Sequence, residues 1–66
     1  MKFKVDEWVL FCQFPDIKIL ANERLKSVVL SILDNDPLYD YEIFIDGSGK
    51  IKKVKEHQLF SMPQPT

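Results

Sequence analysis

The segment from residue 39 to residue 54 constrains the fold more than any other part of the sequence. Residues 39–45 (YDYEIFI) place a large apolar side chain at almost every second position. Residues 46–49 (DGSG) are turn-forming types, and residues 50–54 (KIKKV) read as a returning strand. Two extended segments joined by a glycine-containing turn are typical of a β-hairpin. We therefore predict antiparallel strands on both sides of this turn.

The flanking segments predict more strand and little helix. Residues 8–14 (WVLFCQF) are rich in aromatic and β-branched types and end at a turn-forming Pro-Asp pair. Residues 17–23 have no clear period and predict a loop. Residues 56–60 (EHQLF) are long enough for one helical turn and a short closing strand. Proline prevents residues 62–66 from continuing a sheet, so we expect a domain over 1–61 and a proline-containing tail over 62–66.

Residues 22–34 allow two interpretations. The apolar residues at 25, 28, 29, 32 and 33 have the spacing of an amphipathic helix, with Asn22 in a capping position and Pro37 as a stop. The serine, valine and isoleucine residues of this segment are poor or middling helix formers, and a sharply bent strand of a barrel also carries apolar residues on both faces. We favour a strand here, with a helix as the alternative.

These segments together resemble a Tudor-like member of the Src-homology-3-like (SH3-like) barrels, a group that includes many short bacterial and phage proteins of unknown role. The resemblance covers nearly the whole chain. It is carried by residues 5–9 (VDEWV), 25–32 (LKSVVLSI), 41–47 (YEIFIDG) and 51–54 (IKKV), with Leu59 as the closing apolar residue. It implies an all-β fold, a small five-stranded barrel with a short helical turn near the C-terminus.

The resemblance does not extend to methylated-lysine recognition. Readers of methylated lysine or arginine in this family hold the cation in an aromatic cage. Just before the second strand and just after the third, where the family places cage aromatics, this chain has Arg24 and Gly47. We therefore do not expect a methyl-reader.

Size and charge restrict the function classes. Sixty-six residues, 45% of them apolar, make one domain near the lower limit for a core without a disulfide or metal. Nine basic and ten acidic residues give a net charge of -1, whereas nucleic-acid modules usually have a basic excess. No signal-type or membrane-spanning apolar run is present. Lone Cys12 favours a reducing compartment, so we expect a cytoplasmic protein that contacts no membrane.

The sequence shows no catalytic or metal-binding pattern. Cys12 and His57 are the best nucleophile and base, and they lack a third residue to orient them. The acidic residues between positions 34 and 46 loosely resemble a calcium loop, but the glycine and the closing glutamate fall at the wrong offsets. We expect no enzyme, no cofactor and no metal site.

Alternation along the hairpin separates a core face from an outer face. If Asp46 lies opposite Ile51, the register pairs Phe44 with Lys53, Ile43 with Val54 and Glu42 with Lys55. The core face then carries Tyr41, Ile43, Ile45 and Val54, and the outer face carries Glu42, Phe44, Ile51, Lys53 and Lys55. Most aromatic residues should be in the core of so small a domain, with Phe14 and Phe44 as exceptions.

These exceptions and the neighbouring hairpin residues form the expected contact site, which comprises Phe14, Phe44, Ile51, Lys53 and Lys55. Large apolar groups set among charges on a surface usually mark a contact. We expect a non-catalytic protein-protein interaction module or small accessory subunit, in which sheet edges and the loop from Phe14 to Glu23 also contribute, and which can form a homo-oligomer. The alternative is a nucleic-acid-binding SH3-like barrel that uses the Lys50–Lys55 strand.

Overall fold

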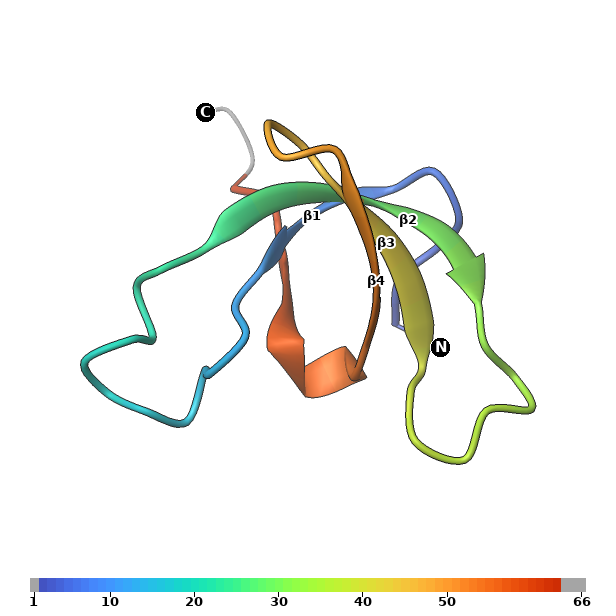
Figure 1. Ribbon diagram of the computed structural model, residues 1–66, viewed down its shortest axis with the longest axis horizontal. Coiled ribbons are helices and arrows are strands. Elements are labelled where there is room, and N and C mark those ends of the chain that lie inside the picture. Colours follow the sequence, from blue (N-terminus) through green and yellow to red (C-terminus); the bar gives the residue numbers. More distant parts are fainter. Residues whose placement is uncertain (1, 64–66) are drawn as a thin grey trace.

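All the strands of the computed structural model, which describes residues 2–63, join one antiparallel sheet (Figure 1). The elements are β1 (Trp8–Phe11), β2 (Leu25–Ile32), β3 (Tyr41–Ile45), β4 (Lys50–Val54), the 3-10 helix η1 (Glu56–Gln58) and β5 (Leu59–Ser61). The predicted all-β class is confirmed, and so is the short helical turn near the C-terminus. Of the predicted tail, residues 64–66 lie outside the described residues.

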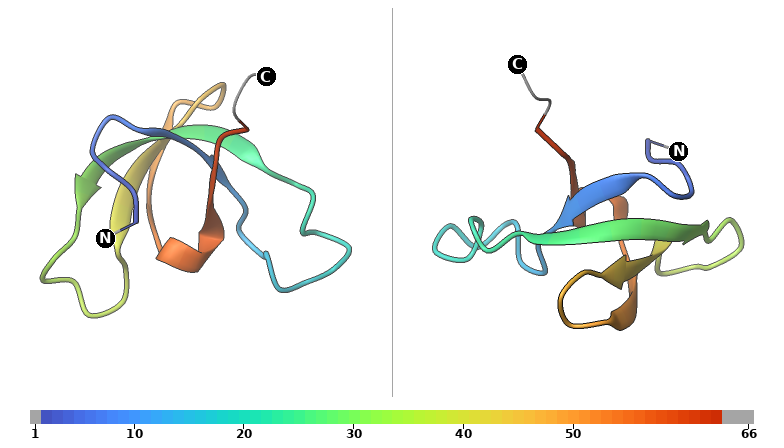
Figure 2. Two further views of the ribbon diagram at one scale, coloured as in Figure 1. Left: turned by 180° about the vertical axis from the view of Figure 1, so that it is seen from behind. Right: turned by 90° about the horizontal axis from the view of Figure 1, so that it is seen from above.

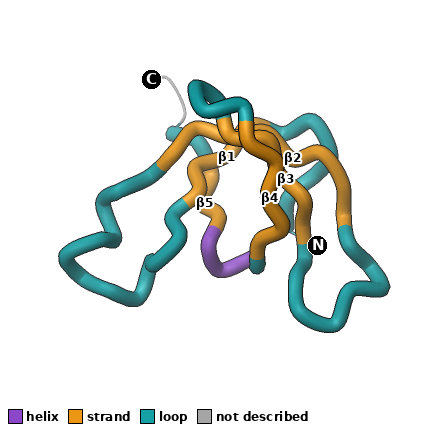
Figure 3. Tube along the Cα trace, viewed as in Figure 1, coloured by secondary structure: helices purple, strands orange, loops and turns teal. Residues whose placement is uncertain are grey.

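The sheet is strongly curved and remains open. Its strand order is β4-β3-β2-β1-β5, so β4 and β5 form the two edges. Between residues 2 and 63, no ladder pairs these two strands with each other. The 3-10 helix η1 connects them below the arch of the sheet in Figure 1, and Figure 3 shows the long loops on either side of the central strands.

The concave face of the sheet forms the hydrophobic core. Its buried residues come from all five strands and from the segment before β1: Phe3, Val9, Phe11, Val29, Tyr41, Ile43, Ile45, Val54 and Leu59. The predicted core residues of the hairpin are therefore confirmed as buried. Each fully buried aliphatic side chain contributes roughly 1.5–3 kcal/mol to folding, which makes this single layer the main source of stability.

Residues 25–32 form a strand, as favoured from the sequence, and a β-bulge explains why they imitate a helix. Val29 pairs with Ile43, but the next pair along the ladder is Ser31 with Glu42, so Leu30 is an extra residue. Beyond a bulge, the positions whose side chains point inward are offset by one residue from strict alternation. The inward positions therefore become 27, 29 and 32, which mixes strand spacing with a three-residue step. Figure 2 shows β2 running the length of the molecule, with a loop at each end.

The hairpin has a register that differs from the predicted one by two residues. Phe44 lies opposite Ile51, not opposite Lys53, and Glu42 lies opposite Lys53, not opposite Lys55. The reason is that the turn begins one residue earlier than expected. Ile45 and Lys50 are the last pair, and Gly47 and Gly49 both have positive φ (90° and 70°) in the turn. Because the shift is even, each side chain stays on its predicted face.

A buried hydroxyl group ties the N-terminal segment to η1. Tyr41 Oη donates a hydrogen bond to Glu56 Oε1 (2.6 Å) and accepts one from the backbone N–H of Phe3 (3.1 Å). The backbone N–H of Lys2 also donates to Glu56 Oε1 (2.9 Å). The Tyr41 hydroxyl and then the Lys2 N–H lower the pKa of Glu56, whereas burial and then the hydrogen bond to Glu56 raise the pKa of Tyr41.

Candidate functional site

An apolar row crosses four strands on the outer, convex face of the sheet. The ladders pair Trp8 with Val28, Val28 with Phe44, and Phe44 with Ile51. Directly paired residues of antiparallel strands project on the same face, with Cβ atoms about 4.5–5.5 Å apart. The four side chains therefore form one continuous strip from β1 to β4, which we call the outer row.

The outer row is accessible to solvent, especially at its ends. Trp8 is 45% exposed and Ile51 is 61% exposed, while Val28 and Phe44 between them are half-buried. Leu30 at the bulge is also exposed. Scattered single apolar residues are normal on a protein surface, but contiguous ones mark contact sites. Four neighbouring strands contribute to this strip, so its apolar side chains are contiguous and not scattered.

Charged side chains border the outer row. The Nζ atom of Lys26 lies 4.9 Å from the centroid of the Trp8 ring. Asp46 is next to Lys26 across the β2–β3 ladder, where its backbone N–H donates to the Lys26 carbonyl (2.9 Å). A polar rim around an apolar centre is the usual arrangement of a protein-protein interface.

Lys53 borders the opposite side of the outer row and is paired with the loop between β2 and β3. Its Nζ atom lies 3.8 Å from Asp36 Oδ2. The backbone N–H groups of Leu38 and Tyr39 donate to Asp36 Oδ1 (2.8 and 2.9 Å), and they lower the pKa of this carboxyl more than Lys53 does. Asp36 thus stays ionised and fixes the loop beside the end of β4.

The structure brings together three of the five expected contact residues. Phe44 and Ile51 are direct neighbours in the outer row, and Lys53 follows Ile51 on the same face of β4. Lys55 lies beyond the end of β4, immediately before η1. Its backbone N–H donates to Oε1 of Gln58, the last residue of η1 (2.9 Å). Phe14 lies in the loop between β1 and β2 and does not belong to the row.

Sequence reasoning missed the other half of the outer row. Trp8 was expected in the core, and Tyr39 with it, but their exposed fractions are 45% and 36%. Alternation in β1 carries the missing signal, because inward Val9 and Phe11 require Trp8 to point outward. Val28 could not be assigned before the bulge in β2 was known.

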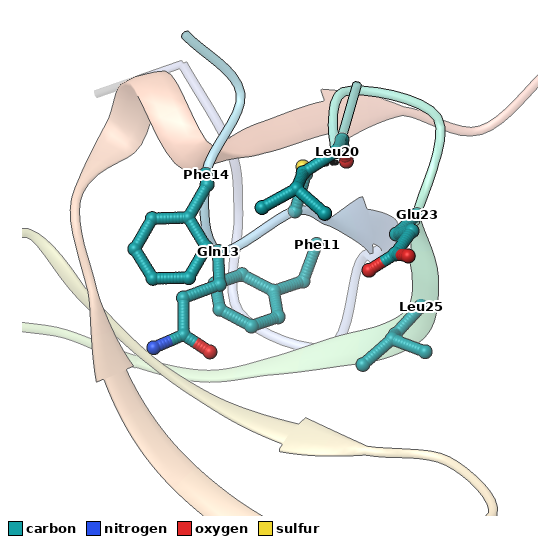
Figure 4. Close-up of a pocket in the computed structure, with 7 residues that line it drawn as sticks. Phe11, Gln13, Phe14, Leu20, Glu23 and Leu25 are labelled. Atoms are coloured by element: carbon teal, nitrogen blue, oxygen red, sulfur yellow. Dashed lines mark hydrogen bonds between the residues drawn. The ribbon is translucent and has the colours of Figure 1, made fainter. Parts of the chain in front are cut away.

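A small pocket lies where β1 leaves the sheet and β2 enters it. It has a volume of about 210 Å³ and is lined by Phe11, Cys12, Gln13, Phe14, Leu20, Glu23 and Leu25. Figure 4 shows Phe14 and Gln13 on one side of this space and Glu23 and Leu25 on the other. Pockets for drug-sized ligands usually measure about 300–1,000 Å³, so this pocket is smaller than a typical ligand site.

The two residues considered for nucleophilic chemistry are engaged in separate places. Cys12 is buried, and its Sγ atom donates a hydrogen bond to the Leu20 carbonyl (3.4 Å). His57 Nε2 lies 3.9 Å from Asp16 Oδ2 on the surface. Residues 2–63 hold no cluster of three or more potential metal-ligating side chains. In the same range, no helix has the length and apolar character needed to cross a bilayer.

Comparisons of the chain with protein-family models, with curated proteins and with solved structures gave no significant match. The case for a function therefore rests on the geometry of the outer row and its charged border.

Proposed function

We propose that the chain is a small SH3-like β domain that acts in the cytoplasm as a non-catalytic protein-protein interaction module or accessory subunit. Its contact surface is the outer row, bordered by Lys26 and Asp46 on one side and by Lys53 on the other. The partner surface is that of a folded protein with apolar groups at its centre and charges of both signs around them. The lone, buried thiol of Cys12 supports a reducing compartment.

The observation that carries the proposal is the continuity of the outer row across β1, β2, β3 and β4. The core of this domain lies on the concave face, so folding alone gives no reason for apolar residues at four paired outward positions. Tryptophan is strongly enriched among the residues that dominate binding energies at interfaces. Trp8 lies at one end of the row with nearly half of its surface exposed, which makes it the best candidate anchor.

The lysines of β4 favour nucleic acid as the second candidate. Lys50 and Lys53 are exposed on this edge strand, and Lys55 follows them. Two of the four lysines in the run are already engaged, since Lys53 pairs with Asp36 and the Nζ atom of Lys52 lies 5.7 Å from the Phe11 ring. We therefore expect binding to nucleic acid in physiological salt no tighter than about 10⁻⁴–10⁻⁶ M, the non-specific range.

Fluorescence anisotropy with labelled single-stranded and duplex oligonucleotides at several salt concentrations tests this second candidate. A nanomolar constant that weakens steeply with salt, and again in Lys53→Glu, would replace the protein-binding proposal with the nucleic-acid one.

Affinity capture with tagged variants tests the protein-binding proposal. The tagged chain is used to capture proteins from an extract of its native host, with untagged copies of the chain included among the proteins scored. Phe44→Glu places a charge in the middle of the outer row. Leu38→Glu is the matched control, because Leu38 is 64% exposed in the β2–β3 loop and is not part of the row.

The proposal predicts that at least one protein is captured by the wild type and by Leu38→Glu and is lost with Phe44→Glu. Melting curves of all three proteins must first show that each is folded. If capture is equal for Phe44→Glu and Leu38→Glu, the outer row is not the contact surface.

A further inference from the structure

The outer row and its charged border are complementary to themselves. From this we infer that the protein partner at this surface is a second copy of the chain, in a two-fold symmetric dimer that stacks the convex faces of two sheets. The inference rests on the proposed function of the outer row and specifies the occupant of that surface. A two-fold interface uses the same patch on both copies. If one residue of the first copy contacts a second residue of the other copy, the same two residues make the contact again with the copies exchanged.

The order of residues in the outer row satisfies this requirement. A two-fold axis that runs parallel to the strands, between β2 and β3, places β1 over β4 of the second copy and β2 over β3. Trp8 then lies over Ile51 of the second copy, and Val28 lies over Phe44. Both contacts join a larger side chain to a smaller one, which allows the two faces to interdigitate.

The charges next to the row support the same axis. Lys26 lies two residues before Val28 on β2. Asp46 is the first turn residue after β3, two residues after Phe44, and its backbone N–H donates to the Lys26 carbonyl, so both residues border the row on the same side. The axis sets Lys26 against Asp46 of the second copy, and Asp46 against Lys26. The dimer therefore contains two equivalent pairs of opposite charge at its rim, which favour this register.

The other in-plane axis is excluded by charge. An axis along the outer row would place each residue of the row on its own counterpart, and would exchange the two borders. Asp46 would then lie against Glu42 of the second copy, because Asp46 follows Phe44 by two residues and Glu42 precedes it by two, on opposite borders of the row. Two such contacts between like charges oppose association, so the axis parallel to the strands is the one that we assign.

The dimer is expected to be weak. The four strands of the outer row, about 4.8 Å apart and about five residues long at roughly 3.4 Å per residue, span about 330 Å² of sheet face. A stable interface of standard size covers about 800 Å² on each partner. The interface is less than half that size, so we expect an equilibrium between monomer and dimer that shifts with concentration.

Charge reversal and mixing test the assigned contact directly. Lys26→Asp and Asp46→Lys each place like charges at both rim pairs of a homodimer, and each should weaken self-association about tenfold. A mixture of the two variants restores opposite charges at both pairs, so the heterodimer should form with an affinity within about threefold of the wild type. Fluorescence-detected sedimentation, with one variant labelled, measures the constants.

Two controls separate the contact from other effects. Lys18→Asp, in the exposed β1–β2 loop, has the same net charge as Lys26→Asp and should gain no affinity for Asp46→Lys. Any effect of either variant on folding acts within a single chain, so mixing two chains cannot rescue it.

The inference is overturned if the wild type stays monomeric at its highest soluble concentration, or if the Lys26→Asp and Asp46→Lys mixture associates no better than the Lys18→Asp control. In that case the proposed function still stands if another protein is captured in a Phe44-dependent manner. If Phe44→Glu has no effect on capture of any protein, including the chain itself, both proposals fail.

Discussion

A glutamate substituted at position 54 should unfold the domain, whereas the same substitution at position 44 should not. Val54 is fully buried on the concave face and lies opposite Tyr41, which is also fully buried. Val54→Glu loses the roughly 1.5–3 kcal/mol of a buried aliphatic side chain, and an unpaired carboxylate in the core costs several kcal/mol more. A core of this size supplies only about 3–5 kcal/mol in total, so no stable folded population should remain.

Phe44→Glu acts on the opposite face of β3, where a carboxylate stays in contact with water. We expect a loss of about 1 kcal/mol or less, which lowers the melting temperature by about 4–8 °C in a domain of this size. Thermal melts followed by far-ultraviolet circular dichroism at neutral pH measure both variants. If Phe44→Glu were unfolded and Val54→Glu folded, the two faces of the hairpin would be exchanged, and the outer row would be the core.

Two further substitutions probe the buried hydroxyl and the turn. Tyr41→Phe should cost about 1–3 kcal/mol in urea denaturation, because it leaves the buried N–H of Phe3 without an acceptor. Because the pKa of Glu56 is lower in the folded than in the unfolded state, its carboxylate stabilises the fold at pH values above its ordinary pKa of 4.5. This contribution is lost as the pH falls through the lower pKa of the folded state. Denaturation between neutral and acidic pH should therefore show a smaller acid-induced loss of stability in Tyr41→Phe than in the wild type. Gly47→Ala should cost about 1 kcal/mol in the same assay, since the cost arises from its φ of 90° and not from a clash.

The fold class and the core face of the hairpin were predictable from local pattern. Alternation in residues 39–45 reports which side chains share a face, and the face does not depend on the register as long as the error is even. The register itself was wrong because the sequence DGSGK allows the four-residue turn to begin at either of two positions. Two glycines at positive φ select Asp46 as the first turn residue, and this conformation is not visible in the sequence.

The outer row was only half predictable, because it depends on contacts between distant segments. Phe44 and Ile51 are close in sequence and belong to one hairpin, so alternation identified them. Trp8 and Val28 join them only through the β1–β2 and β2–β3 ladders. The bulge at Leu30 disguised the face of Val28 by giving β2 the apolar spacing of a helix. Phe14 was expected in the same contact site as Phe44, but the chain leaves the sheet after Phe11 and carries Phe14 into the loop pocket.

Site-specific photo-crosslinking tests the central claim, that the outer row is the surface through which this domain contacts a protein. A benzophenone amino acid replaces Ile51 at the exposed end of the row, or Ile19 in the β1–β2 loop, whose exposed fraction of 85% makes it the more accessible of the two. After irradiation in the native host, we predict that position 51 yields a discrete crosslinked protein, either a second copy of the chain or another partner, and that position 19 does not. Crosslinks from position 19 with none from position 51 would contradict the account.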